Sequence, residues 1–117
     1  MASLLFSPFF GPVVMEVTAY TLDPRECGKL PSDPWYGITA SGKRVQEGVT
    51  VAAGKGIPFG GTVVLIEGLG FRIVQDRGGM IKDHNLDVYM EDRREALKFG
   101  RRELKVYILN KEYIERG

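Results

Sequence analysis

The sequence predicts a mostly β fold, a small barrel of about six strands with one short helix. Three observations lead to this prediction. Several short runs alternate in polarity or are rich in β-branched residues, glycine-rich turns separate them, and one later segment has helical start and stop signals. The chain has 117 residues, a typical size for one domain with its own hydrophobic core.

We place this single domain at residues 15–117. Residues 1–14 are apolar but short and are broken by Pro8, Gly11 and Pro12. They lack the basic start of a signal peptide and the length of a membrane-spanning helix, so we expect no membrane insertion. An apolar arm, the remnant of a leader or of a cloning boundary, and a strand that docks on the domain all remain open.

The first strand is expected at residues 15–20, with Thr18 and Tyr20 on one face and apolar residues on the other. Residues 21–36 contain three prolines together with Asp, Gly and Ser, which is typical of a long loop. The glycines of residues 54–61 fit neither common nucleotide-binding spacing. We therefore interpret that stretch as scaffold.

The densest β region follows. The runs 62–67 and 71–75 flank a glycine turn and predict a hairpin. The fully apolar run 63–66 suggests burial on both faces, as inside a barrel. Further strands are expected at residues 86–90 and 103–110.

One helix is expected at residues 91–100. Acidic residues suit its N-terminus, because the helix dipole is positive there, and Gly100 is a typical residue just past a C-terminus. Its inner face is expected to contain Ala96, Leu97 and Phe99.

Composition excludes several functions. Sixteen basic and fifteen acidic residues leave a net charge of +1, without the cationic cluster that nucleic-acid binding requires. Cys27 is the single cysteine, so an internal disulfide is excluded and thiols are too few for a zinc site. We predict a free thiol there, no metal site, no cofactor and no nucleic-acid partner.

Two aspartates stand out because they lie at strand ends. Asp76 follows an apolar strand and precedes the Gly78–Gly79 corner, and Asp87 lies between two apolar residues. Each carboxylate could accept backbone N–H groups at the corner, or Asp76 could pair with Arg77 or Lys82. Alternatively, a partly buried carboxyl group at the edge of a groove can act as a general acid, because burial raises a carboxyl pKa towards neutrality. The local pattern leaves both alternatives open.

Several motifs occur together in order. They are "TAY" (18–20), "GITASG" (37–42), "VAAGKGIPFGGTVV" (51–64), "QDRGGMIKDHNLDVYM" (75–90), "EALKFGRR" (95–102) and "VYIL" (106–109). Between about residues 15 and 109 the chain thus resembles the 3D (three-aspartate) domain. That family has a double-psi β-barrel fold and occurs in bacterial cell-wall remodelling proteins, in Gram-positive stationary-phase survival and resuscitation-promoting proteins, and in the catalytic domain of membrane-bound lytic transglycosylase A.

The resemblance implies a secreted or cell-wall lytic transglycosylase. Such an enzyme cleaves the bond between N-acetylmuramic acid and N-acetylglucosamine in peptidoglycan glycan strands without water, and leaves a 1,6-anhydromuramyl end. It implies that Asp87 is the catalytic acid and base and that Asp76 lines the same groove. The positions that it places near substrate are Tyr20, Thr39, Lys82, Gly78 and Gly79.

One departure from the family pattern leaves alternatives open. The family's first aspartate is missing, because the corresponding stretch from Ala52 to Lys55 contains no acid. The chain could therefore be a non-catalytic polysaccharide-binding module, with aromatic residues stacking on sugar faces. It could also be an interaction domain that forms a homo-oligomer through residues 1–14. The aromatic residues for the binding alternative are Trp35, Tyr36, Tyr20 and Tyr89.

Overall fold

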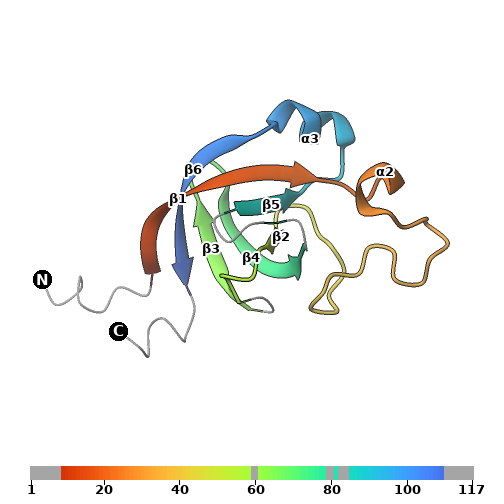
Figure 1. Cartoon of the computed structure of the whole chain (residues 1–117), viewed down its shortest axis with the longest axis horizontal. Coiled ribbons are helices and arrows are strands. Elements are labelled where there is room, and N and C mark those ends of the chain that lie inside the picture. Colours follow the sequence, from red (N-terminus) through yellow and green to blue (C-terminus); the bar gives the residue numbers. More distant parts are fainter. Residues whose placement is uncertain (1–8, 59–60, 79–80, 82–84, 110–117) are drawn as a thin grey trace, which may run out of the picture.

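The computed structural model describes residues 9–58, 61–78, 81 and 85–109. The strands are β1 (Phe9–Tyr20), β2 (Thr50–Ala53), β3 (Val63–Ile66), β4 (Gly70–Arg77), β5 (Asn85–Tyr89) and β6 (Arg102–Leu109), and the helices are α2 (Pro24–Cys27) and α3 (Arg93–Phe99). The six strands close into a barrel in the order β1-β5-β2-β4-β3-β6 (Figure 1). The predicted mostly β barrel is confirmed.

Two of the strand pairs are parallel, and each joins strands that are far apart in the sequence. β1 runs parallel to β5, and β2 runs parallel to β4. The other four pairings are antiparallel. The long connections that parallel pairing requires leave room for loops beside the barrel, and the closed barrel agrees with the double-psi fold that the resemblance implies.

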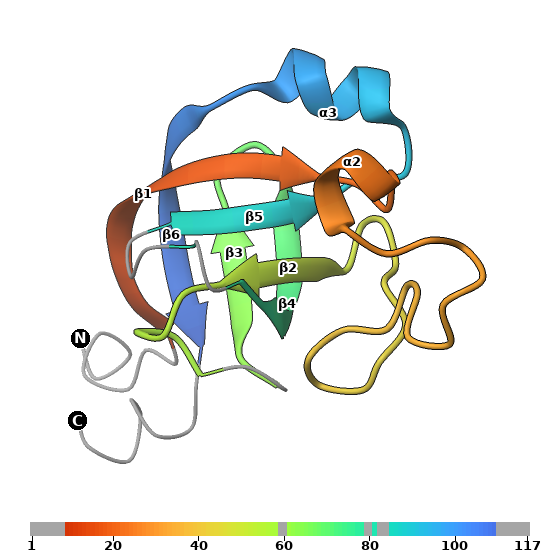
Figure 2. The same ribbon diagram turned by 45° about the vertical axis from the view of Figure 1, so that its right-hand side comes forward.

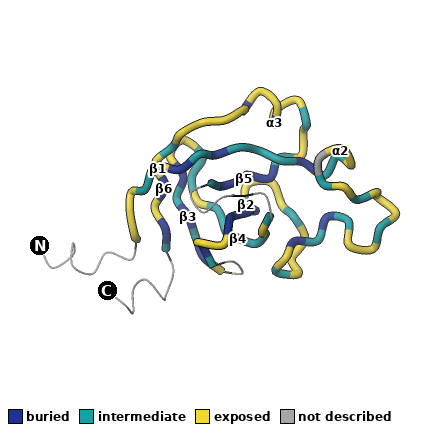
Figure 3. The backbone as a smooth tube through the Cα atoms, viewed as in Figure 1, coloured by how far each residue is buried: buried dark blue, intermediate teal, exposed yellow. Residues whose placement is uncertain are grey.

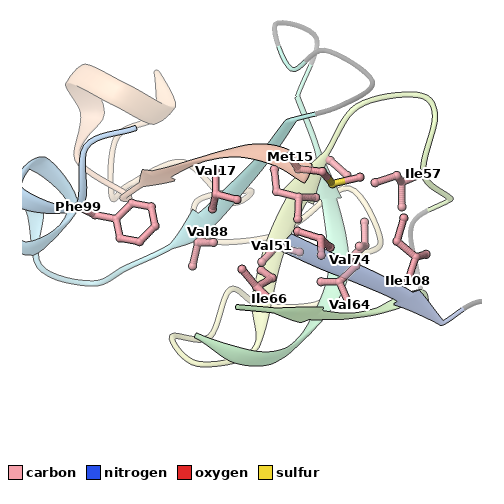
Figure 4. Close-up of a cluster of buried hydrophobic side chains, with 13 residues drawn as sticks. Met15, Val17, Val51, Ile57, Val64, Ile66, Val74, Val88, Phe99 and Ile108 are labelled. Atoms are coloured by element: carbon pink, nitrogen blue, oxygen red, sulfur yellow. The ribbon is translucent and has the colours of Figure 1, made fainter. Parts of the chain in front are cut away.

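The barrel interior is filled by aliphatic side chains. Figure 4 shows Phe99 at one end of this core and Ile57 and Ile108 at the other. In β3 burial alternates, with Val64 and Ile66 buried and their neighbours half-buried. The expectation that residues 63–66 are buried on both faces is therefore wrong, because an antiparallel barrel strand turns only every second side chain inwards.

The first strand starts earlier than the sequence predicts. β1 begins at Phe9, and Val13 and Val14 pair with β6. Residues 9–14 thus extend the barrel strand, in line with the docked-strand alternative, and residues 1–8 lie outside the described part of the chain. β1 is longer than predicted because it pairs with β6. The alternation of polarity within one strand gives no information about such pairing.

Helix α3 ends at Gly100 as predicted, but it begins at Arg93 instead of residue 91 and has a narrower inner face. The side chain of Asp92 caps its start by accepting the Arg94 backbone N–H, and Gly100 ends it with φ 64°. Ala96 and Phe99 are buried, whereas Leu97 is 62% exposed. The assignment of Leu97 to the inner face is wrong because consecutive helical residues point about 100° apart. No helix among the described residues combines the length and apolar character needed to cross a lipid bilayer.

Residues 21–49, between β1 and β2, form a separate protrusion that we call the lobe. Figure 2 shows it projecting from one side of the barrel, and Figure 3 shows that most of it is exposed or half-buried. Its residues 21–36 are loop, as predicted, apart from the single helical turn α2 (Pro24–Cys27). Inside it, the Thr39 backbone N–H donates to the Lys43 carbonyl at 2.7 Å and Ile38 pairs with Arg44. The Ser41 N–H donates to the carbonyl of Gln75 in β4 at 3.0 Å, which ties the lobe to the barrel.

Candidate functional site

A groove of about 680 Å³ lies where the lobe meets the barrel. Its barrel side includes Tyr20, Ala52, Asp76 and Asp87, and its lobe side includes Trp35. Within the described ranges, no three His, Cys, Asp or Glu side chains gather as a metal site would require. Among the described residues that line the groove, the acidic ones are Asp76 and Asp87.

The strand register places both aspartates beside one small residue. Ala52 of β2 pairs with Asp87 of β5 on one side and with Asp76 of β4 on the other. Because neighbouring strands lie about 4.8 Å apart, the two aspartate backbones are separated by roughly 10 Å. Ala52 lies between them and lines the groove.

A β-bulge in β4 turns Asp76 towards the groove. Val51 pairs with Val74 but the next residue, Ala52, pairs with Asp76, so Gln75 is an extra residue in β4. Without this bulge, simple alternation would place Asp76 on the same face as Val74, which is fully buried in the core. The Thr50 hydroxyl donates to Gln75 Oε1 at 2.6 Å and holds the extra residue in place.

The Asp76 carboxylate joins three parts of the molecule. Its Oδ1 accepts the backbone N–H groups of Ala40 and Arg77, each at 2.9 Å, and its Oδ2 accepts the Tyr20 hydroxyl at 3.2 Å. The donors come from the lobe, from β4 and from β1. Asp76 therefore fixes the lobe against the barrel while it contributes negative charge to the groove.

Tyr20 is suited to remain a hydrogen-bond donor. Burial, and then the nearby charge of Asp76, raise the pKa of Tyr20 well above its usual value of 10.0. The ring of Tyr89 packs against it edge-on, with ring centroids 5.6 Å apart. Tyr20 lines the groove and contacts Asp76. The resemblance places a substrate-binding residue at this position.

Asp87 faces the groove from the middle of β5. Its neighbours Leu86 and Val88 point into the core, so alternation turns the half-buried Asp87 outwards. The hydroxyl of Thr18, its register partner in β1, donates to Asp87 Oδ1 at 3.1 Å and also lies 3.4 Å from the Leu86 carbonyl. The orientation of this carboxyl group is therefore fixed by a neighbouring strand.

The remaining predicted positions differ in their placement. Thr39 is buried, lines the groove and donates its hydroxyl to the Lys43 carbonyl at 2.8 Å, so that hydroxyl takes part in a turn of the lobe. Gly78 also lines the groove. Gly79 and Lys82 lie outside the described residues.

Sequence reasoning missed Thr18, which contacts Asp87, and Lys29, which lines the groove. Thr18 was not assigned to the site, although its alternation with Tyr20 on one strand face was a usable signal. Lys29 lines the groove from the lobe, and a loop sequence offers no periodicity that could have placed it there.

The fold and this groove define a closed β-barrel with two aspartates in a cleft between barrel and lobe, and comparison with known proteins gives its family. Residues 49–110 match the 3D domain. The protein named "Putative cell wall shaping protein YabE" of Bacillus subtilis (strain 168) is 30% identical over 96 residues, which are 80% of this chain and 22% of that protein. The chain spans about a fifth of the length of that relative. It belongs to the 3D domain family.

Proposed function

We propose that this chain acts on the bacterial cell wall and cleaves peptidoglycan glycan strands as a lytic transglycosylase. It would then work in the cell wall or outside the cell, where that polymer lies. The observation that carries the proposal is Asp87, oriented by Thr18 in a groove that it shares with Asp76. Membership of the 3D domain family and the name of the relative support the cell-wall part.

In the proposed reaction Asp87 acts first as an acid and then as a base. Its carboxyl group gives a proton to the oxygen that bridges the two sugars, the bond from C1 of the muramyl unit to that oxygen breaks, and the glucosamine unit leaves with a hydroxyl group. The C6 hydroxyl oxygen of the same muramyl unit then closes on C1, and Asp87 takes its proton. This restores the acid and consumes no water.

Asp76 supports this chemistry from the opposite side of Ala52, and the hydroxyl of Tyr20 reaches it from β1. A fixed carboxylate favours the positive charge that develops on the muramyl ring as the bond breaks. The hydrogen bonds from Ala40, Arg77 and Tyr20 hold the Asp76 carboxylate in one position, so little reorganisation is needed during the reaction. The small Ala52 side chain lines the groove between the two acids.

The direct test is digestion of purified peptidoglycan by the wild type and by Asp87→Asn, with products identified by mass spectrometry. The proposal predicts anhydromuramyl ends from the wild type and a loss of about 100-fold or more in the variant, as expected when a general acid is removed. Asp92→Asn, at the exposed start of α3 and outside the groove lining, is the matched control and should keep wild-type activity, because asparagine caps a helix about as well as aspartate. Undiminished activity in Asp87→Asn would refute the assignment.

A binding module without turnover is the second candidate. Two observations favour it: Ala52 occupies a groove position with no acid, and Trp35 presents an exposed aromatic ring to the groove. A binding module would sediment with insoluble peptidoglycan and release no soluble fragments. The enzyme proposal predicts both binding and release.

A further inference from the structure

The lobe carries an aromatic side chain that the barrel chemistry does not use. Trp35 is 66% exposed and lines the groove. It lies outside residues 49–110, which match the 3D domain. A single exposed apolar side chain is common in proteins, so its significance depends on how it is held.

The backbone of Trp35 is fixed on both sides. Its N–H donates to Asp33 Oδ1 at 2.8 Å, and its carbonyl accepts the Ile38 N–H at 3.1 Å and the Lys29 ammonium group at 3.4 Å. These contacts hold the backbone that carries the indole ring while leaving most of the ring exposed. A ring mounted on an ordered backbone loses less conformational entropy when a ligand packs on it.

Lys29 places a positive charge beside the backbone carbonyl of Trp35. It lines the same groove, and its ammonium group donates to the Trp35 carbonyl. Among the described side chains it forms no ion pair. Because an ammonium group has three donors, it can bind the Trp35 carbonyl and a ligand carboxylate at once.

The charges in the groove separate two regions. On the barrel side the groove is lined by Asp76 and Asp87, which repel an anionic group, and by Arg77. On the lobe side Lys29 supplies a positive charge that favours a negatively charged ligand group there. An aromatic ring and an ammonium group that line the same groove suit a sugar that carries a carboxylate, since sugar C–H groups pack on aromatic rings and ammonium groups bind carboxylates.

We propose that Trp35 and Lys29 form a subsite on the lobe for a carboxylate-bearing amino sugar, a muramyl unit with its lactyl or stem-peptide carboxylate. The indole ring packs on the sugar face and the ammonium group binds the carboxylate. The inference rests on the proposed action on peptidoglycan and names the part of the substrate that the lobe selects. With this subsite, the lobe would make the chain bind muramyl glycans more tightly than neutral glycans.

Trp35 is the only tryptophan of the chain, so intrinsic fluorescence reports on this subsite directly. The Asp87→Asn variant, which should bind without cleaving, is titrated with purified muropeptides and with neutral N-acetylglucosamine oligomers. We expect a saturable emission change with both ligands and about fivefold tighter binding of muropeptides, the size of a partly exposed ion pair. Adding Lys29→Met should remove this preference, and Lys43→Met, an exposed lysine outside the groove lining, should keep it.

Calorimetry tests the aromatic part independently of fluorescence. Trp35→Ala should weaken binding of both ligands about tenfold, whereas Leu30→Ala, which removes a lobe side chain of similar exposure, should not. Binding seen by calorimetry without any change in Trp35 emission overturns the proposal, as does a muropeptide preference that survives Lys29→Met. If the wild type cleaves nothing but these titrations behave as expected, the catalytic proposal fails and the subsite stands.

Discussion

Thr18 and Asp87 face each other across two parallel strands, with the Thr18 hydroxyl 3.1 Å from Asp87 Oδ1. The contact joins residues 69 positions apart in the sequence. It depends on the parallel pairing of β1 with β5, which aligns each residue of 16–20 with one of 85–89. The barrel closure therefore sets the direction of the proposed catalytic carboxyl group.

Replacing Thr18 by valine should reduce turnover while the barrel stays folded. Valine has a similar shape but cannot donate a hydrogen bond, and a hydrogen bond to a charged group contributes roughly 1.5–3 kcal/mol. We expect kcat to fall about tenfold or more, with KM nearly unchanged. Thr18→Ser keeps the hydroxyl and should retain most activity. Equal losses in both variants would show that the methyl group, rather than the hydroxyl, matters at this position.

Replacing Tyr20 by phenylalanine should change how stability depends on pH. Burial and Asp76 raise the pKa of Tyr20 in the folded state above the 10.0 of an exposed tyrosine. The stability contributed by its neutral hydroxyl is therefore complete below pH 10 and is lost as pH rises above it, because the unfolded chain ionises first.

Urea unfolding at several pH values measures this effect. At neutral pH the wild type should be more stable than Tyr20→Phe by about 1 kcal/mol, the value of one hydrogen bond. The difference should shrink at pH values above 10. A difference that stays constant across the alkaline range contradicts the placement of this hydroxyl against Asp76.

Two substitutions at Asp76 separate its structural role from its charge. Asparagine keeps an oxygen for the Ala40 and Arg77 N–H groups and can donate to the Tyr20 oxygen, so the unfolding free energy should stay near that of the wild type. Alanine removes all three contacts and should cost roughly 2–3 kcal/mol. We expect kcat of Asp76→Asn to fall about tenfold, because the stabilising charge is lost. Full activity in that variant would limit Asp76 to holding the lobe.

An aspartate at position 52 should shift the pH–rate profile. Ala52 pairs with both Asp76 and Asp87, so a carboxylate there would disfavour ionisation of its neighbours. The alkaline limb of the activity profile should move up by about one pH unit in Ala52→Asp. Ala52→Asn has the same size without the charge and should not shift it. Superimposable profiles for the two variants would mean that position 52 does not face both acids.

Local sequence patterns predicted the features of this fold that depend on a single strand or helix. Alternation placed Thr18 and Tyr20 on one face of β1, and both now contact the two acids. Capping chemistry placed the end of α3 at Gly100. These features depend only on near neighbours in the sequence.

Features that depend on distant pairing could not be predicted. The bulge at Gln75 reverses the face of Asp76, and only the register with β2 reveals it. The bond from the Ala40 N–H to Asp76 spans 36 residues and depends on how the lobe folds back. The resemblance to a family supplied both aspartates, whereas their partners required the three-dimensional structure.

The origin of the oxygen at the newly formed muramyl end tests the central claim most directly. Peptidoglycan is digested in water enriched in oxygen-18, and the released fragments are analysed by mass spectrometry. If Asp87 directs the C6 hydroxyl of the muramyl unit onto C1, the wild type will release anhydromuramyl ends that contain no label. Labelled reducing ends would show that water is the nucleophile and would contradict the account.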